Sequence, residues 1–221
     1  MLSGITTLIT SKIHQQIIKQ FDECWVPDVE KGLNYSGKLG HLKKHKLNLK
    51  YLGVLSRFKY LKLDIKYNLL VVLSGPEPQR TLLENKLLKE LQNYDGTILF
   101  VRGVLNKKNK ITLPTNFKVV NYLLSSELER EINQSELVLA RSGYSTIMDL
   151  AVLGKKAFFI PTPGQYEQEY LAKILSKNLI APFEIQQNFT VNNLKKSIKF
   201  TGFSTSKSVV NLDFFNLFKG K

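Results

Sequence analysis

From Asn68 onward, apolar runs alternate with amphipathic segments, and this alternation limits the folds open to the chain more than any other feature. The segment NLLVVLS at residues 68–74 carries a continuous apolar run and breaks into Gly75-Pro76, as a buried parallel strand does before a turn. Chains in which strands alternate with helices fold as a parallel sheet with right-handed crossovers. We therefore expect an α/β fold built on a doubly wound parallel sheet.

The same pattern continues to about residue 200. The expected strands are short apolar runs at residues 68–74, 96–103, 117–123, 136–140 and 156–161. The expected helices have apolar residues at helical spacing and cover residues 78–94, 126–134, 145–154 and 167–178. Ser126 and Glu129 have the spacing of a capping box at the start of one helix. The doubly wound core at 68–200 is therefore expected to lie in one domain, residues 68–221.

The first 67 residues have a different organisation. They predict one helix at 5–21, a short strand at 22–27, and a strand and turn at 49–58. One helix and two strands cannot bury a core of their own. We therefore expect residues 1–67 to be the remnant of a preceding α/β domain together with an interdomain linker.

The chain is strongly basic, with 32 Lys and Arg against 18 Asp and Glu and a net charge of +14 in 221 residues. Residues 1–68 hold twelve of the basic and five of the acidic side chains, so the excess is densest there. Such a surface attracts phosphate-bearing partners, whether nucleotides, anionic lipid headgroups or nucleic acid. The alternative is a lysine-rich composition that only solvates the surface.

The cysteine content and the apolar runs of the sequence bear on the cellular compartment of the protein. The single cysteine, Cys24, excludes a disulfide framework and a cysteine-rich zinc site. No apolar run reaches the ~18 residues that a membrane span needs, and the first residues lack the pattern of a signal peptide. We therefore expect a cytoplasmic protein.

In open α/β sheets, ligands bind beyond the carboxyl ends of the strands, and three such loops carry suggestive residues. In the first, Gly75 would let a ligand approach the backbone and Ser74 could offer a hydroxyl to a phosphate; the alternative is a plain turn. In the third, Gln165 and Gln168 follow a strand that ends at Pro161, and their amides suit sugar hydroxyls. The alternative there is a polar loop and first helical turn.

The second loop carries the strongest signal. A strand ends at Ala140, a turn follows, and a helix begins with free backbone N–H groups that suit a diphosphate. Small and hydroxyl-bearing residues crowd this point, namely Ser142, Gly143, Tyr144, Ser145 and Thr146. Asp149 shares a helix face with Ser145 and Thr146 and could accept ribose hydroxyls. The alternative is a serine cap with an aspartate that faces solvent.

Several enzyme signatures are missing from the sequence. It has no Asp-x-Asp pair to hold a divalent metal, no P-loop, no G-x-S-x-G and no G-x-G-x-x-G. The histidines His41 and His45 lie among lysines, which disfavours a cation site. We therefore expect neither a metal nor a cofactor.

Residues 141–172, RSGYSTIMDLAVLGKKAFFIPTPGQYEQEYLA, resemble the donor-binding half of the MurG-type glycosyltransferases, the family 28 C-terminal domain of the GT-B fold. Order and spacing agree over this stretch: Ser-Gly with hydroxyl residues, an acidic helix residue, a glycine, an apolar strand ending in proline, and a glutamine-bearing helix start. Ser74-Gly75 lies where the family has a glycine-rich donor loop. GVLSR at residues 53–57 resembles the interdomain Gly-x-x-x-Arg segment.

The resemblance implies a metal-independent, inverting transfer of a sugar from a nucleotide donor, commonly a UDP-sugar. It places the diphosphate at residues 142–146, the ribose at Asp149 and the donor sugar at Gln168, with Gln165 a weaker candidate. It also places Arg57 within reach of the diphosphate, and Leu124 and Ser125 near the uracil-contacting backbone. No nucleic acid is expected as a partner.

The sequence departs from the family pattern in two ways. Glu169 stands where the pattern has a second Gln and Ala172 where it has Asn, which leaves the identity of the sugar open. The acceptor domain, with its glycine-rich loop and general base, is represented only by its tail, so the catalytic residues are not identified. The chain is thus expected to be a truncation, or one subunit that needs a partner chain.

Two other functions stay open. A nucleotide-sugar epimerase on the same fold would need an acidic pair and a different loop at residues 160–168. A basic nucleic-acid-binding module would need exposed aromatics between basic residues, whereas most Phe and Leu here fall inside strands. MurG-type enzymes meet lipid-linked acceptors at the inner membrane face, so we also expect peripheral attachment to an anionic membrane through the leader lysines, Lys38, Lys43, Lys44, Lys46 and Lys50.

Overall fold

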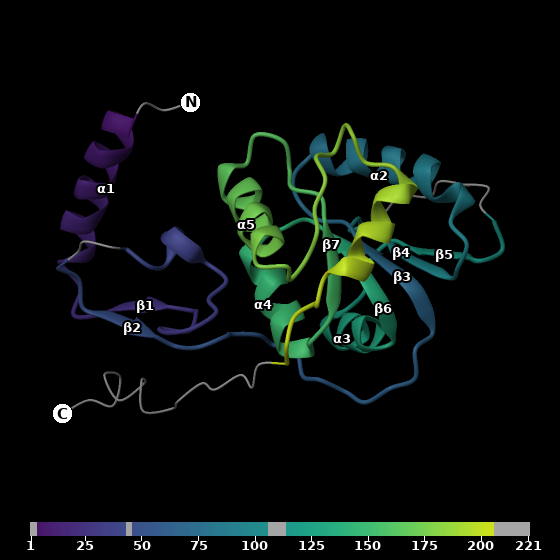
Figure 1. Ribbon diagram of the computed structural model, residues 1–221, viewed down its shortest axis with the longest axis horizontal. Coiled ribbons are helices and arrows are strands. Elements are labelled where there is room, and N and C mark those ends of the chain that lie inside the picture. Colours follow the sequence, from purple (N-terminus) through teal and green to yellow (C-terminus); the bar gives the residue numbers. More distant parts are fainter. Residues whose placement is uncertain (1–3, 43–45, 106–113, 206–221) are drawn as a thin grey trace. The chain divides into compact units, whose positions relative to one another are not determined.

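The computed structural model describes residues 4–42, 46–105 and 114–205 (Figure 1). The described residues divide into two compact units, with the boundary between Leu55 and Ser56.

The first unit contains a helix and a two-stranded sheet. Helix α1 covers Gly4–Ile18, and strand β1 (Cys24–Val26) pairs in parallel with β2 (Leu49–Tyr51); a 3₁₀ turn, η1, covers Gly37–Leu39. The loop after β1 is organised by Asp28, whose fully buried carboxylate accepts hydrogen bonds from the N–H groups of Tyr35 and Ser36. The expected helix and strands are thus present, and each is shorter than the sequence predicts.

The second unit is built on a five-stranded sheet in which every neighbouring pair is parallel. Its strand order is β5-β4-β3-β6-β7. The strands are β3 (Tyr67–Val72), β4 (Ile98–Val101), β5 (Phe117–Val120), β6 (Ser135–Ala140) and β7 (Lys156–Phe159). The predicted α/β class and doubly wound parallel sheet are therefore confirmed.

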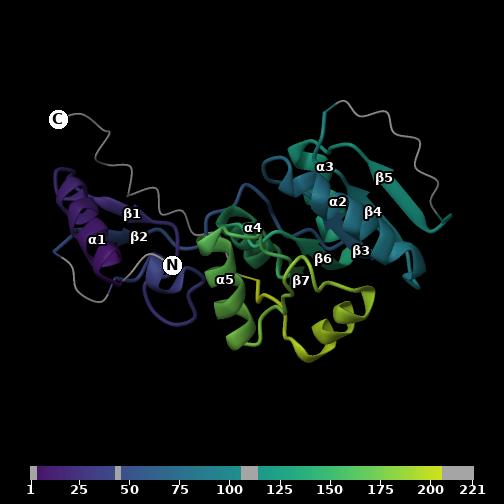
Figure 2. The same cartoon turned by 90° about the horizontal axis from the view of Figure 1, so that it is seen from above.

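Helices cover both faces of this sheet. They are α2 (Gln79–Glu90) with the 3₁₀ turn η2 (Leu91–Asn93), α3 (Ser125–Asn133), α4 (Tyr144–Leu153), α5 (Tyr166–Lys177) and the 3₁₀ segment η3 (Val191–Lys199), which the sequence reading did not anticipate. The chain winds outward from β3 to β5 and then resumes on the other side at β6. Because right-handed crossovers that run in opposite directions place their helices on opposite faces, α2 covers one face and α3 and α4 the other. Figure 2 shows α2 lying over β3 and β4.

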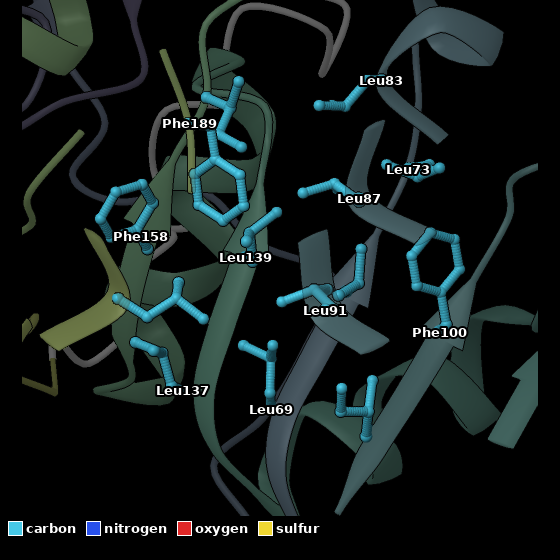
Figure 3. Packing of buried hydrophobic residues seen from close by; sticks show 14 residues of the cluster. Leu69, Leu73, Leu83, Leu87, Leu91, Phe100, Leu137, Leu139, Phe158 and Phe189 are labelled. Carbon is cyan, nitrogen blue, oxygen red and sulfur yellow. The ribbon is translucent and has the colours of Figure 1, made fainter. Parts of the chain in front are cut away.

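The main apolar core fills the space under α2. Leu83, Leu87 and Leu91 are fully buried against alternate residues of the strands, among them Leu69 and Leu139 (Figure 3). Phe158 and Phe189 extend this cluster toward β7, with ring centroids 5.7 Å apart in an edge-on arrangement. This packing holds the strands in register, so that their carboxyl ends form one edge.

The predicted capping box is wrong in its position. Helix α3 begins at Ser125, so Ser126 lies inside its first turn. The Glu127 carboxylate accepts a hydrogen bond from the Leu124 N–H at 2.7 Å. The acidic residue that reaches back to the start of the helix is therefore Glu127, whereas the sequence predicts Glu129. Because Ser125 and Ser126 are both suitable cap residues, the sequence leaves the first residue of this helix ambiguous. The Glu127 side chain, which bonds back to the backbone, fixes the start at Ser125.

Candidate functional site

The point where the winding direction reverses lies between β3 and β6, which are neighbours in the sheet. Val72 at the end of β3 is in register with Ala140 at the end of β6. The loop that carries exposed Ser74 and Gly75 and the loop that carries Ser142 therefore leave the sheet side by side. In open parallel sheets, ligands bind in the crevice at this point.

Helix α4 starts at this edge with Gly143 as its N-cap, and its first full-turn hydrogen bond runs from the Ile147 N–H to the Gly143 carbonyl at 3.0 Å. The leading N–H groups of a helix have no acceptor within the helix and carry the positive end of its dipole. Ser145 is exposed, and Tyr144 and Thr146 are half-buried. A Cβ built on Gly143 would meet only Thr146 Oγ1, at 4.0 Å, so packing in the described chain does not require a glycine there.

The hydroxyl of Ser142 forms a hydrogen bond within the protein and is not presented to a ligand at the carboxyl edge of the sheet. Its side chain is fully buried, and its Oγ donates to the Gln168 carbonyl oxygen at 2.8 Å. The contact ties the loop after β6 to the first turn of α5. Backbone N–H groups, rather than this hydroxyl, are thus the donors that the turn can offer to an anion.

The two glutamines of the third loop lie together. Gln168 Oε1 accepts a hydrogen bond from the Thr162 N–H at 2.9 Å, and its Nε2 donates to Gln165 Oε1 at 2.5 Å. Glu169 Oε1 accepts from the Gly164 N–H at 3.1 Å. These contacts shape the loop between β7 and α5 and bring Ser142, Gln165 and Gln168 to the same place.

Asp149 lies one and a half turns into α4 and is half-buried. Its Oδ1 accepts a hydrogen bond from Ser56 Oγ at 2.5 Å. Burial raises the pKa of the Asp149 carboxyl, and the Ser56 hydroxyl and the Arg57 charge oppose that rise. Arg57 is exposed, with its guanidinium carbon 4.9 Å from the Phe58 ring centroid. The sequence reading grouped Arg57 with the site but missed Ser56, because 93 residues separate Ser56 from its acceptor.

Arg141 is a second residue that the sequence reading missed. It follows β6 directly and is buried, with 2% of its surface exposed. Its guanidinium donates to the carbonyl oxygens of Ile160, Pro161 and Gln79 and to Gln186 Oε1, at 2.7 to 3.1 Å. Burial lowers the pKa of Arg141 to about 10. The available signal was an arginine at the end of an otherwise apolar strand.

Both backbone groups of Leu124 form hydrogen bonds at the start of α3. Its N–H donates to the Glu127 carboxylate, and its carbonyl accepts from the Leu128 N–H at 2.8 Å and keeps a second lone pair. Nearby, a cavity of about 610 Å³ is lined by Tyr122, Leu123 and Leu124 together with residues of β5 and α3. Tyr122 is half exposed there and offers an aromatic face.

Among residues 4–42, 46–105 and 114–205, no helix has the length and hydropathy to cross a membrane. Within the same part of the chain, no three His, Cys, Asp or Glu side chains are grouped as metal ligands.

Among curated proteins, the chain is similar to bacterial enzymes named UDP-N-acetylglucosamine–N-acetylmuramyl-(pentapeptide) pyrophosphoryl-undecaprenol N-acetylglucosamine transferase. The enzyme from Haemophilus ducreyi is 27% identical over 130 residues, which are 57% of this chain and 36% of the relative. That from Rhodopseudomonas palustris is 30% identical over 118 residues, or 52% of this chain and 30% of the relative. The chain thus spans about a third of the length of these relatives.

Among solved structures, the glycosyltransferase of kitacinnamycin superposes with a TM-score of 0.53 at 14% identity, covering 68% of this chain and 40% of that one. The glycosyltransferase SnogD from Streptomyces nogalater superposes with a TM-score of 0.51 at 11% identity, covering 68% and 48%. These likenesses show a shared fold. The model of the glycosyltransferase family 28 C-terminal domain matches residues 70–205, which include the whole parallel sheet from Leu70 and every loop at its carboxyl edge. The chain therefore belongs to the family of glycosyltransferase family 28 C-terminal domains.

Proposed function

We propose that this chain is the donor-binding part of an inverting, metal-independent glycosyltransferase that uses a UDP-linked sugar. The observation that carries the proposal is the meeting of two loops and the N-terminus of α4 at the switch point between β3 and β6. The family supports a nucleotide sugar as the donor, and the names of the relatives supply UDP as the nucleotide.

The diphosphate would lie against the turn at residues 142–146. The N–H groups that open α4 provide hydrogen-bond donors and a positive dipole end, and the bare backbone of Gly143 leaves room for a phosphate to approach. Ser74 and Gly75 would border the same space from the β3 loop. Neutralisation by helix N-termini needs no metal, which is why we propose metal independence.

The ribose would lie beside Asp149. An ionised carboxylate can accept hydrogen bonds from two hydroxyls, and the Ser56 hydroxyl occupies one side of this carboxylate and fixes its orientation. Arg57, on the same segment, would add a positive charge on the diphosphate side.

The donor sugar would lie over the loop between β7 and α5, where Gln165 and Gln168 meet. Each amide already uses part of its hydrogen-bonding capacity within the loop, so its orientation is fixed before a ligand arrives. The base would lie near Leu124 and Ser125, beside the cavity that Tyr122, Leu123 and Leu124 line.

The remaining parts of a complete transferase would lie outside residues 68–221. We propose that residues 1–67 are the tail of an acceptor domain whose main part, with the general base, is supplied by a longer chain or by a partner chain. A lipid-linked acceptor and a cytoplasmic membrane surface would follow from that assignment. Of the five leader lysines, Lys43 and Lys44 lie outside the described residues, and Lys50 forms an ion pair with Glu23.

Hydrogen exchange tests where the donor binds. With UDP-N-acetylglucosamine present, we expect slower amide exchange at Ser74 and Gly75 and at residues 142–149, and no change at the amino-terminal ends of β3 and β6. Protection confined to the opposite edge of the sheet, or spread evenly over the unit, would contradict the proposed site.

A further inference from the structure

The carboxyl edge of the sheet contains a buried positive charge, and no carboxylate among the described residues is bonded to it. All four acceptors of the Arg141 guanidinium are uncharged oxygens, three from the backbone and one from Gln186. Its Nε is buried and has no hydrogen-bond partner among the described residues. Carbonyl oxygens satisfy the donors of this side chain, but they do not neutralise its charge.

Elsewhere in the same unit, buried arginines are paired with a carboxylate. Arg80 and Arg102, each 3% exposed, lie on either side of the Glu84 carboxylate, with 2.7 Å between Arg80 Nη1 and Glu84 Oε2. Pairing of this kind is the rule for buried charges, because an isolated charge loses its hydration without compensation. Arg141 departs from this rule, although its pKa of about 10 still leaves it protonated at neutral pH.

The position of Arg141 suggests what completes the pair. Its acceptors come from Gln79, the first residue of α2, and from Ile160 and Pro161, the two residues after β7. Arg141 itself directly follows β6 and precedes the Ser142-Gly143 turn. The charge therefore lies where the loops after β6 and β7 begin and where the loop after β3 ends at α2. The same guanidinium holds the start of α2 against this edge.

We propose that Arg141 is a positioning residue that makes this site selective for the charged diphosphate over the uncharged nucleoside. This inference rests on the proposed function. The buried charge is compensated when a diphosphate binds at residues 142–146, without a direct contact between the guanidinium and the ligand. The interior attenuates such a field less than water does, so the charge acts across several ångströms.

The second unit offers a matched control at the other edge of the sheet. Lys155 is also buried, and its Nζ donates to the carbonyl oxygens of Asn133 and Ser135 at 2.7 and 3.0 Å. Burial lowers the pKa of Lys155, as it does for Arg141. Removing its charge tests the general effect of deleting a buried cation far from the proposed diphosphate site.

The experiment compares the affinities of UDP and uridine for the wild type, Arg141→Met, Arg141→Lys and Lys155→Met, by calorimetry and ligand-observed NMR on the full chain. We expect Arg141→Met to lower the ratio of UDP to uridine affinity by tenfold or more while uridine affinity changes less than twofold. Arg141→Lys and Lys155→Met should keep the ratio within threefold of the wild-type value.

The outcomes separate the two proposals. A wild type that binds no UDP overturns the proposed function. If the wild type binds UDP but Arg141→Met weakens both ligands equally, Arg141 only supports the fold and the inference is wrong. Should Arg141→Met fail to fold, Arg141→Lys decides: a retained ratio supports selection by charge, and a ratio that falls tenfold overturns it.

Discussion

At the scale of single residues, the protonation state of Asp149 that favours the fold is the opposite of the state that the proposed function needs. Burial raises the pKa of its carboxyl above the ordinary 3.8, so the folded chain binds a proton there more readily than the unfolded chain does. Its contribution to stability is therefore greatest at low pH and is lost as the pH rises through the raised pKa. Ribose binding needs the opposite state, the ionised carboxylate.

Replacement of Asp149 with Asn separates these two effects. We expect Asp149→Asn to weaken UDP binding by about 1.5–3 kcal/mol, the value of hydrogen bonds to a charged group. The variant should be no less stable than the wild type to urea at neutral pH, because it removes a half-buried charge. For the wild type, UDP affinity should fall as the pH is lowered through the raised pKa, and this acid limb should be absent from the variant. Level UDP affinity with a large loss of stability would show that Asp149 is structural.

Residue roles were only partly predictable from the sequence. Spacing alone groups Ser145, Thr146 and Asp149 on one helix, since helix geometry is local. It could not reveal that the Ser142 hydroxyl is buried against Gln168, or that Ser56 holds Asp149, because both contacts join segments brought together only by the fold.

At the scale of secondary-structure elements, the loop after β3 is shaped by a close backbone approach. Gly103 has a φ of +69°, and a Cβ on it would lie 2.3 Å from the Leu73 carbonyl oxygen, just before the Ser74-Gly75 turn. Gly164 has a similar φ of +79° but nothing within 4 Å of its Cβ position. A comparison of alanine substitutions at these two glycines therefore distinguishes the cost of backbone strain from the cost of steric overlap.

We expect Gly164→Ala to destabilise the protein by about 1–2 kcal/mol, the cost of a left-handed conformation for an L-residue. Gly103→Ala should cost clearly more, because the Leu73 backbone must move as well, and it should also weaken UDP binding. Urea unfolding and calorimetry measure both quantities. Equal losses of stability in the two variants would contradict the close approach.

The buried Arg80–Glu84–Arg102 cluster links α2 to the end of β4. Glu84→Gln would leave two buried arginines without their shared carboxylate, so we expect a loss of about 3–5 kcal/mol in the free energy of unfolding. The control is Glu90→Gln on the same helix, where Glu90 Oε1 lies 3.8 Å from Lys86 Nζ. This substitution should lower the free energy of unfolding by less than about 1 kcal/mol. A Glu84→Gln variant as stable as this control would show that the cluster does not hold the two elements together.

Elements were easier to predict than their ends. Every strand of the parallel sheet was located from its apolar run, because a strand buried on both faces leaves a continuous signal. The start of α3 was misplaced because Ser125, Ser126 and the acidic residues after them allow several caps. Segment η3 was missed because its buried residues, Leu194 and Ser197, give only a weak apolar pattern over so short a segment.

At the scale of the whole molecule, the excess of basic residues raises the question of a membrane. Each lysine near an anionic bilayer contributes about 1 kcal/mol, screened by salt. Because Lys50 is paired with Glu23, we expect Lys50→Gln to weaken vesicle binding less than Lys46→Gln, whose side chain is exposed. Co-sedimentation with vesicles of anionic and of neutral lipid measures this. Equal pelleting with both lipids would end the membrane proposal.

The central claim is that the carboxyl edge of the parallel sheet binds a nucleoside diphosphate through helix N-termini and without a metal. Titration calorimetry of the full chain with UDP, in buffer with EDTA and in buffer with added Mn²⁺, tests it most directly. We predict one UDP bound per chain, with the same affinity in both buffers. No heat of binding in either buffer, or binding that requires the added Mn²⁺, would contradict the account.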